Sequence, residues 1–416
     1  MPALARISVG HRFETLSARG PGFDHIRLIA ALTVVFHHAW WGVNDILYRY
    51  SHGYMQLGLF AVIIFFSISG FLVVPGLVRS GNVVKFVVNR SLRIFPALVL
   101  VVLASMFVLG PLLTKYPLAR YFASPELYLY LKNITTLMAH YLPGVEWGVK
   151  EVQINGALWT LNIEVGSYAL LAAFSIVGLL SRREVMLVVF GVVYLVHIAI
   201  ALTLWLNAAV PMRLVNFIGL FVYFDAGTCL YLYARKIPFS GFWAAAALVL
   251  GVTGLGLGIG AVVLPLCVPY LVVYLGLSDL PGRMPLKHDL SYGVYLIHSP
   301  IILMFRTTLG LGAGGLLALL AALVTLPLAY LSWKFVEAPA LTRKALLYGW
   351  VSRHLPRFAK RWSGGAPRRA ETYDLPRDEI EADWATRSEH AFAAALRSEA
   401  GGRQSDRGLP TGAELR

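Results

Sequence analysis

Charged residues are scarce in this chain of 416 residues, where Asp, Glu, Lys and Arg together make up only 14%. Soluble domains carry about a quarter charged residues, so the composition excludes an ordinary soluble enzyme. Cysteine is nearly absent, and Cys229 and Cys267 both lie inside apolar runs. This placement favours small core side chains over a disulfide or a metal site, and it excludes a disulfide-stapled secreted domain. Collagen-like and disordered chains are excluded because 57% of the residues are hydrophobic.

Several catalytic signatures are also missing from the sequence. It has no phosphate-cradling glycine loop, no cluster of zinc ligands and no Gly-x-Ser-x-Gly nucleophile elbow. Its acidic residues are too scattered for the two-carboxylate pair of a glycosidase. We therefore expect no metal, and any chemistry has to come from polar residues within the apolar part of the chain.

Long apolar runs are the main feature of the sequence. A helix needs roughly 20 mostly apolar residues to cross a bilayer, and such runs predict an all-α membrane protein, a bundle of about ten transmembrane helices. The predicted spans lie near 25–44, 57–79, 93–114, 156–180, 186–206, 213–234, 241–256, 259–278, 290–310 and 314–337. Only Gly-rich sequence separates the seventh run from the eighth, so one long broken span is an alternative there.

Basic residues follow the second, fourth, sixth and tenth runs, and the net charge is +14. The positive-inside rule makes this side cytoplasmic, which predicts cytoplasmic termini, an even number of spans and contact with anionic membrane lipids rather than nucleic acid. We expect a multi-pass protein of a bacterial inner membrane. Its predicted parts are a cytoplasmic segment 1–22, a membrane domain 23–340 and a charged, largely disordered cytoplasmic tail 341–416, with a short helix near 378–398.

Ionisable side chains at membrane depth cost roughly 2.5–3.5 kcal/mol each on insertion scales, so they indicate functional sites. In the first run, Arg27 and His38 are eleven residues apart, which puts them on one helix face about 16 Å apart. That spacing suits an elongated ligand with its anionic group on Arg27 and its reactive end at His38, a potential general base. The alternative is a topology arginine and a histidine that hydrogen-bonds between helices.

Two other segments offer groups that could bind a ligand. Arg90 and Arg93 are three apart, so their guanidinium forks are neighbours on a helix and could grip phosphates; contact with lipid head groups is the alternative. Ser69 lies in a stretch whose small residues favour close helix packing, although its hydroxyl could also bind a substrate.

The fourth and ninth runs also contain polar residues. The fourth opens with Trp159, Asn162 and Glu164, and a buried glutamate needs a partner or a proton. It could orient an imidazole, bind sugar hydroxyls or pair with an arginine. In the ninth run, Tyr295 and His298 share a helix face. Structural roles are the alternative for both, and Glu337 at the end of the tenth run is expected to pair with a nearby Lys or Arg.

Six of these stretches, in this order, resemble the motifs of the acyltransferase-3 family of integral membrane acyltransferases, which includes bacterial O-acetyltransferases of surface polysaccharides. The matching stretches are Phe23-Asp24-His25-Ile26-Arg27-Leu28-Ile29-Ala30-Ala31-Leu32 with His38 after it, Phe65-Phe66-Ser67-Ile68-Ser69-Gly70-Phe71, Arg90-Ser91-Leu92-Arg93-Ile94-Phe95-Pro96, Leu158-Trp159-Thr160-Leu161 with Glu164, Ser291-Tyr292-Gly293-Val294-Tyr295-Leu296 with His298, and Phe335-Val336-Glu337. The resemblance covers about 20–340. The chain departs from the family at His25, Phe36-His37 and Ala338.

The resemblance implies ten core helices and transfer of an acyl group, usually acetyl from acetyl-coenzyme A, to a hydroxyl of a carbohydrate. It implies that Arg27, Arg90 and Arg93 contact the phosphates of the coenzyme and that His38 is the catalytic base. Because His37 precedes it, which of the two imidazoles reacts stays open.

We further expect Asp24 to orient Arg27, Glu164 to guide the acceptor, and five other residues to contact the substrate. These are Ser69, Trp159, Asn162, Tyr295 and His298. The predicted acceptor is a carbohydrate or a lipid-linked glycan. The alternatives are acylation of a small secreted metabolite such as a macrolide and, outside enzymes, a proton-coupled transporter whose buried His and Glu relay protons.

Overall fold

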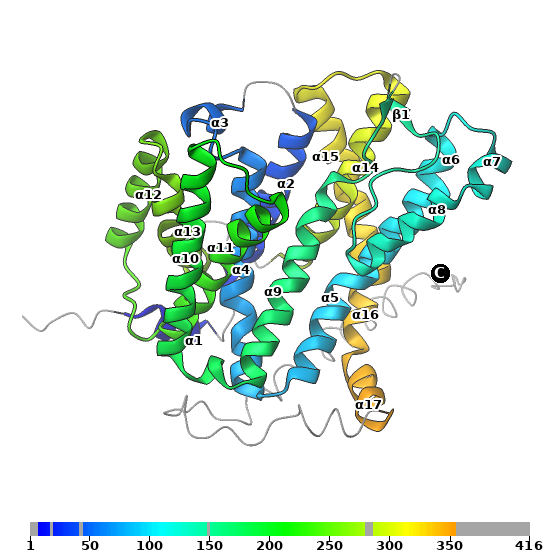
Figure 1. Ribbon diagram of the computed structural model, residues 1–416. Helices are drawn as coiled ribbons and strands as arrows, with labels where there is room; N and C mark the ends of the chain where they lie inside the picture. The colour runs from blue at the N-terminus through cyan, green and yellow to red at the C-terminus, as the bar shows by residue number, and fades with distance from the viewer. Residues whose placement is uncertain (1–6, 17–19, 41–44, 148–149, 279–285, 355–416) are drawn as a thin grey trace, which may run out of the picture. The chain divides into compact units, whose positions relative to one another are not determined.

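The computed structural model describes residues 7–16, 20–40, 45–147, 150–278 and 286–354, and most of these residues are helical (Figure 1). Ten long helices coincide with the ten predicted runs in this described part. They are α2 (Pro21–Ala39), α4 (Leu57–Ser80), α5 (Val83–Ala104), α9 (Trp159–Ile176), α10 (Arg183–Trp205), α11 (Met212–Leu232), α12 (Gly241–Gly256), α13 (Gly260–Leu277), α14 (Ser291–Leu309) and α15 (Gly315–Ser332). The seventh and eighth runs form two helices, with Gly258 at a φ of +73° between them.

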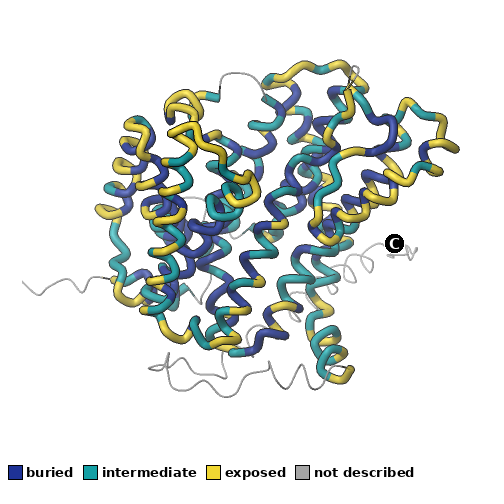
Figure 2. Tube along the Cα trace, in the orientation of Figure 1, coloured by how far each residue is buried: buried dark blue, intermediate teal, exposed yellow. Residues whose placement is uncertain are grey.

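The chain is an all-α membrane protein. Seven helical stretches among the described residues are long and apolar enough to cross a membrane, and they include the ones built on α4, α5, α9, α10, α11, α13 and α15. Figure 2 shows that exposed and buried stretches alternate along the helices of the bundle. Large apolar residues of α10 are exposed, with Val188 at 65% and Leu195 at 66%. A surface of this kind is stable against lipid tails and unstable in water. The count of ten crossings remains a prediction.

The two ends of the described chain lie at the same end of the bundle, where α1 (Val9–Thr15) and α17 (Lys344–His354) are found (Figure 1). This arrangement agrees with an even number of crossings. That this end faces the cytoplasm remains a prediction. The predicted tail is helical through α16 (Ala338–Thr342) and α17, and the short helix predicted near 378–398 lies outside the described residues.

The start of α5 differs from its prediction. Gly81 ends α4 in the left-handed conformation, with a φ of 58°, and the Asn82 side chain accepts a hydrogen bond from the Lys85 amide at 2.8 Å. These two caps start α5 at Val83 rather than near residue 93. Arg90 and Arg93 therefore lie within the helix and not in a connector. Hydropathy placed the start too late because both arginines lower the apolar average.

Helices α4 and α11 pack closely through small residues. A Cβ atom on Gly70 would overlap the carbonyl of Phe224, and one on Gly227 would overlap the carbonyl of Ser67. Small residues allow helix backbones to approach in membranes. This contact supports the packing interpretation of the small-residue stretch and fixes the position of α4 beside the cavity described below.

The connectors at the opposite end from α1 and α17 contain short elements (Figure 1). They are α3 (Ile46–Tyr50), α6 (Gly110–Leu113), α7 (Leu118–Ala123), α8 (Pro125–Leu129), a 3-10 turn Tyr130–Thr135, and the antiparallel strands β1 (Glu146–Trp147) and β2 (Lys150–Glu151). A π-helical turn, Ser105–Leu109, joins α5 to α6, a second, Trp333–Glu337, joins α15 to α16, and 3-10 turns at Gly156–Leu158 and Leu179–Ser181 flank α9.

Candidate active site

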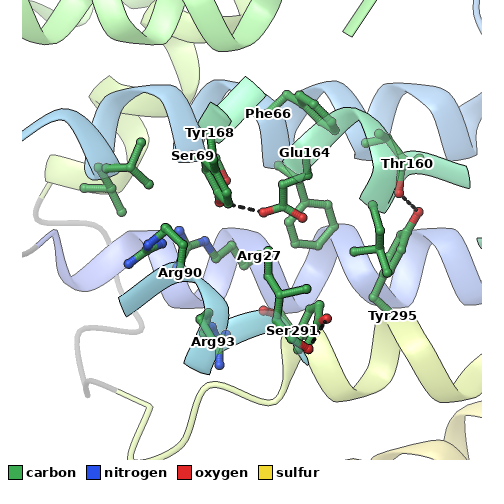
Figure 3. Close-up of a pocket in the computed structure, with 17 residues that line it drawn as sticks. Arg27, Phe66, Ser69, Arg90, Arg93, Thr160, Glu164, Tyr168, Ser291 and Tyr295 are labelled. Carbon is green, nitrogen blue, oxygen red and sulfur yellow. Dashed lines mark hydrogen bonds between the residues drawn. The ribbon is translucent and has the colours of Figure 1, made fainter. Parts of the chain in front are cut away.

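A cavity of about 260 Å³ lies among α2, α4, α5, α9 and α14 (Figure 3). Its lining brings together six of the predicted site residues from five helices, which are Arg27, Ser69, Arg90, Arg93, Glu164 and Tyr295. Figure 3 shows the three arginines with Tyr168 at one end, the Thr160–Tyr295 pair at the other, and Glu164 between them. The cavity is therefore basic at one end and less polar towards the other.

Arg93 forms ion pairs with two acidic side chains of the protein. Its guanidinium donates through Nη1 to Glu337 at 3.1 Å and through Nη2 to Asp289. The ion pair with Arg93 confirms the expectation that Glu337 pairs with a nearby Lys or Arg. Glu337 also accepts a hydrogen bond from Ser332 at 3.2 Å. Both arms of the Arg93 fork are occupied, so this residue joins α5, α14 and the end of α15.

Asp289 connects the arginines to one another. Arg27 lies 3.8 Å from Asp289 and 3.9 Å from Asp24, longer contacts than those of Arg93. Burial alone would raise the pKa of the Asp289 carboxyl, but Arg93 and Arg27 outweigh it and hold that pKa below its ordinary value. That Asp24 orients Arg27 stays a prediction.

Arg90 differs from its two neighbours. Its guanidinium lies 5.8 Å from the centre of the Tyr168 ring, and no described acid is within ion-pair distance of it. Burial and the neighbouring Arg90 and Arg93 lower the pKa of Lys344, which shows that the basic end extends to the start of α17. Of the three arginines, Arg90 has the greatest freedom to bind an anion.

The middle of the cavity contains a carboxylate. The Tyr168 hydroxyl donates a hydrogen bond to Glu164 Oε1 at 2.6 Å (Figure 3). Glu164 and Tyr168 are four residues apart and so share one face of α9. Phe65 and Phe66 contribute an apolar wall opposite. The sequence reasoning did not single out Tyr168, although its spacing from Glu164 was a usable signal.

The far end of the cavity is formed by Tyr295. Its hydroxyl is 2.6 Å from the Thr160 hydroxyl and donates to the Ala157 carbonyl at 3.0 Å. The centre of its ring lies 6.0 Å from that of His298. His298 does not line the cavity, so Tyr295 is a lining residue whose ring neighbours this histidine.

His38 and His298 form a hydrogen-bonded pair across α2 and α14. His38 Nδ1 lies 2.7 Å from His298 Nε2, and the His298 Nδ1 atom lies 3.1 Å from the Val294 carbonyl oxygen. His37 faces elsewhere, with its Nδ1 atom 3.3 Å from Asp45. His38 is thus directed into the bundle towards the imidazole of His298. The His298 ring in turn neighbours Tyr295, which lines the cavity.

Three contacts position the helices that carry this pair. Pro300 lacks an amide hydrogen and leaves the carbonyl of Leu296 free, and Asn155 Nδ2 donates to that oxygen at 2.8 Å. Arg306 Nη2 lies 3.3 Å from the Ala39 carbonyl at the end of α2, and its guanidinium is 5.3 Å from the centre of the Trp147 ring. The connector opposite α1 and α17 is therefore attached to α14, and Arg306 of α14 is in turn bonded to the end of α2.

Three of the five predicted substrate residues are not part of the cavity lining, namely His298, Trp159 and Asn162. Asn162 is exposed on α9, and Trp159 is half-buried against the apolar core. Asp289 was missed by the sequence reasoning, although its position just before the ninth run could have indicated it. In the described part of the chain, no group of three or more His, Cys, Asp or Glu residues could hold a metal ion. Cys229 and Cys267 are free and buried.

Comparison with known proteins adds to this geometry. The sequence model of a family described as an acyltransferase domain matches residues 21–334. The chain is 29% identical over 333 residues to an O-acetyl transferase of Shigella phage Sf6, covering 78% of this chain and 96% of the relative. It is 30% identical over 378 residues to Nodulation protein 10 of Rhizobium leguminosarum bv. viciae, covering 83% and 99%. No solved structure matches the chain.

Proposed function

The chain belongs to the acyltransferase-3 family and is an acyltransferase, and on that premise we propose that it transfers an acetyl group from acetyl-coenzyme A to a hydroxyl of a cell-surface or exported carbohydrate. We place it in the inner membrane of a bacterium, with the arginine end of the cavity towards the cytoplasm. The observation that carries this proposal is a cavity with arginines at one end and an imidazole pair just beyond the other.

The donor fits the basic end of the cavity. Arg90 and Arg27 supply bidentate contacts to phosphates, while Arg93 holds Asp289 and Glu337 and shapes the site. A cavity of about 260 Å³ is smaller than the pockets that enclose whole ligands of drug size. We therefore assign it to the acyl-bearing arm of the donor, with the nucleotide outside at the arginines. Glu164 lies where it can accept a hydrogen bond from the arm or from the acceptor hydroxyl.

His38 acts as the general base in this mechanism. Its Nε2 atom takes the proton of the acceptor hydroxyl as the oxygen attacks the thioester carbonyl carbon. The C–S bond then breaks, the thiolate takes the same proton back from Nε2, and the products are an O-acetyl ester and a free thiol. Tyr295 lines the cavity and its ring centre is 6.0 Å from that of His298, whereas neither His38 nor His298 is part of the lining. We therefore expect the Tyr295 side chain to move when the thioester reaches His38.

The direct test is release of free thiol from acetyl-coenzyme A by the purified protein in lipid nanodiscs, with a carbohydrate acceptor present. We expect thiol release that depends on the acceptor and that is lost in His38→Gln. A proton-coupled transporter would release no thiol above the buffer rate, and that result would overturn the proposal.

The acceptor class needs a separate experiment. Ester-linked acetyl groups on surface and exported glycans should be present with the gene and absent in its deletion strain, and they should return with a plasmid copy but not with His38→Gln. Unchanged glycans together with a lost acetyl ester on a lipid-linked or small secreted metabolite would move the acceptor to that class.

A further inference from the structure

The hydrogen bonds around His298 fix which ring nitrogen of His38 carries its proton. His298 Nδ1 lies 3.1 Å from the carbonyl oxygen of Val294, and a carbonyl oxygen only accepts hydrogen bonds. The proton of a neutral His298 ring must therefore be on Nδ1. Its Nε2 atom is left with a lone pair, which can act only as an acceptor.

The contact between the two rings then determines the state of His38. His38 Nδ1 and His298 Nε2 are 2.7 Å apart, a distance that requires one proton between them. Since His298 Nε2 accepts, His38 Nδ1 must donate. The ring planes are 14° apart with centres 5.0 Å apart, which fits two rings meeting edge to edge through this bond rather than stacking face to face.

A doubly protonated His298 would reverse the argument, but its surroundings oppose that state. The ring is fully buried, and no acid of the described residues lies within ion-pair distance of it. The nearest described cation on its own helix, Arg306, contacts the backbone at the end of α2. A positive charge on the His298 ring would therefore be buried without an acidic partner, which is strongly unfavourable.

We propose that His298 is a positioning residue that holds His38 in the tautomer with a proton on Nδ1 and a lone pair on Nε2. This inference rests on the proposed role of His38 as general base. The Nε2 lone pair is the one that takes the hydroxyl proton, and the His38 Nδ1–H bond to His298 strengthens as His38 becomes positively charged. His298 itself touches no substrate and remains neutral, with its proton on the Val294 carbonyl side.

Two substitutions at position 298 separate hydrogen bonding from packing. The side-chain oxygen of Gln reaches the position of Nε2 and can accept from His38, whereas Leu fills similar space and cannot. We expect His298→Leu to lower kcat by about 10²-fold, the usual contribution of a correctly held base, with KM for acetyl-coenzyme A changed less than twofold. His298→Gln should keep kcat within about tenfold of wild type by the same reasoning. Equal losses in both variants, or none in His298→Leu, would overturn the proposal.

A measurement that needs no turnover tests the tautomer itself. Protein labelled with ring-¹⁵N histidine in nanodiscs should give a His38 signal with a protonated Nδ1 and an unprotonated Nε2, assigned by its loss in His38→Gln. In His298→Leu the proton should move towards Nε2, the form preferred by a free imidazole in water. A wild-type His38 with its proton on Nε2 would refute the proposal. Because this spectrum is independent of thiol release, failure of the tautomer proposal and failure of the proposed function give different results.

Discussion

Two arginines on one face of α5 have different surroundings, although they are one turn apart. Arg93 donates to Glu337 and Asp289, and Glu337 is almost completely buried. Arg90 lies against the Tyr168 ring and has no described acid beside it. From the sequence, both arginines are predicted to contact phosphates in the same way. The acids that pair with Arg93 and not with Arg90 lie about 200 residues or more further along the chain.

This difference predicts opposite phenotypes for the two alanine substitutions. Arg93→Ala should lower the unfolding free energy by about 3 kcal/mol, because it leaves a buried carboxylate without its cation. Arg90→Ala should leave the thermal midpoint in detergent unchanged and raise KM for acetyl-coenzyme A about tenfold, the value of one charge-assisted hydrogen bond. Arg90→Lys is the matched control, and it should recover part of the affinity. The phosphate assignment fails if Arg90→Ala weakens binding of the acceptor alone.

The adjacent histidines also have separate roles. His38 bonds to His298, whereas His37 pairs with Asp45 at the start of α3. We expect His38→Gln to reduce thiol release to background and His37→Gln to retain at least about a tenth of wild-type activity, since in the proposed mechanism only the first removes the general base. Both variants should elute from size-exclusion chromatography like wild type. The reverse ranking would transfer the catalytic assignment to His37.

At the scale of helices, α4 is fixed against α11 by glycines at the point of closest approach. The sequence predicted helix packing for the small residues of 65–71. The structure confirms this for Gly70, whereas the adjacent Ser69 lines the cavity. Adjacent residues on a helix point about 100° apart, so one stretch can pack against a helix and line a site. A sequence pattern cannot assign each residue to one of these faces without the neighbouring helix.

Adding one methyl group to α4 should therefore have an effect that depends on its position. Gly70→Ala should destabilise the protein by about 1–3 kcal/mol, as overpacking of a tight contact does, and should reduce activity through the displaced cavity wall. Gly76→Ala is the control, because nothing lies within 4 Å of a Cβ atom at that position. Thermal unfolding in detergent measures both. Equal midpoints for the two variants would contradict the close contact.

The junction of α2, α5 and α14 at Asp289 should make stability sensitive to acid. Because the folded pKa of Asp289 is depressed, its contribution is fully present above the ordinary value of about 4 and is lost as pH falls through the folded value. Wild type should therefore unfold at a higher temperature than Asp289→Asn. This difference in unfolding temperature should be constant between about pH 5 and 7 and should decrease below about pH 4. A difference that grows on acidification would show the opposite linkage.

At the scale of the whole molecule, hydropathy located all ten long helices, since lipid exposure requires apolar side chains over the length of a span. It could not find the start of α5, which depends on the caps at Gly81 and Asn82. The six motifs indicated which residues gather around the cavity. They could not show that His38 and His298 lie outside the cavity lining while Tyr295 is part of it, because this depends on how the helices pack.

The direction of the bundle in the membrane can be tested with single cysteines in a background without Cys229 and Cys267. Asn207→Cys and Lys150→Cys should react with a membrane-impermeant maleimide applied outside intact spheroplasts. Arg79→Cys and Ser181→Cys should react only after permeabilisation, since the basic connectors are expected on the cytoplasmic side. All four positions are exposed. Labelling of Arg79→Cys from outside would invert the predicted orientation.

The two paired histidines stand 260 positions apart in the chain, on the first and the ninth of the long helices. During synthesis His38 is inserted into the membrane early, and its hydrogen bond to His298 can form only after nearly the entire membrane domain has been inserted. A nascent or truncated chain that contains Arg27, Arg90 and Arg93 but lacks His298 would therefore be inactive. The protein would become catalytically active only near the end of its synthesis.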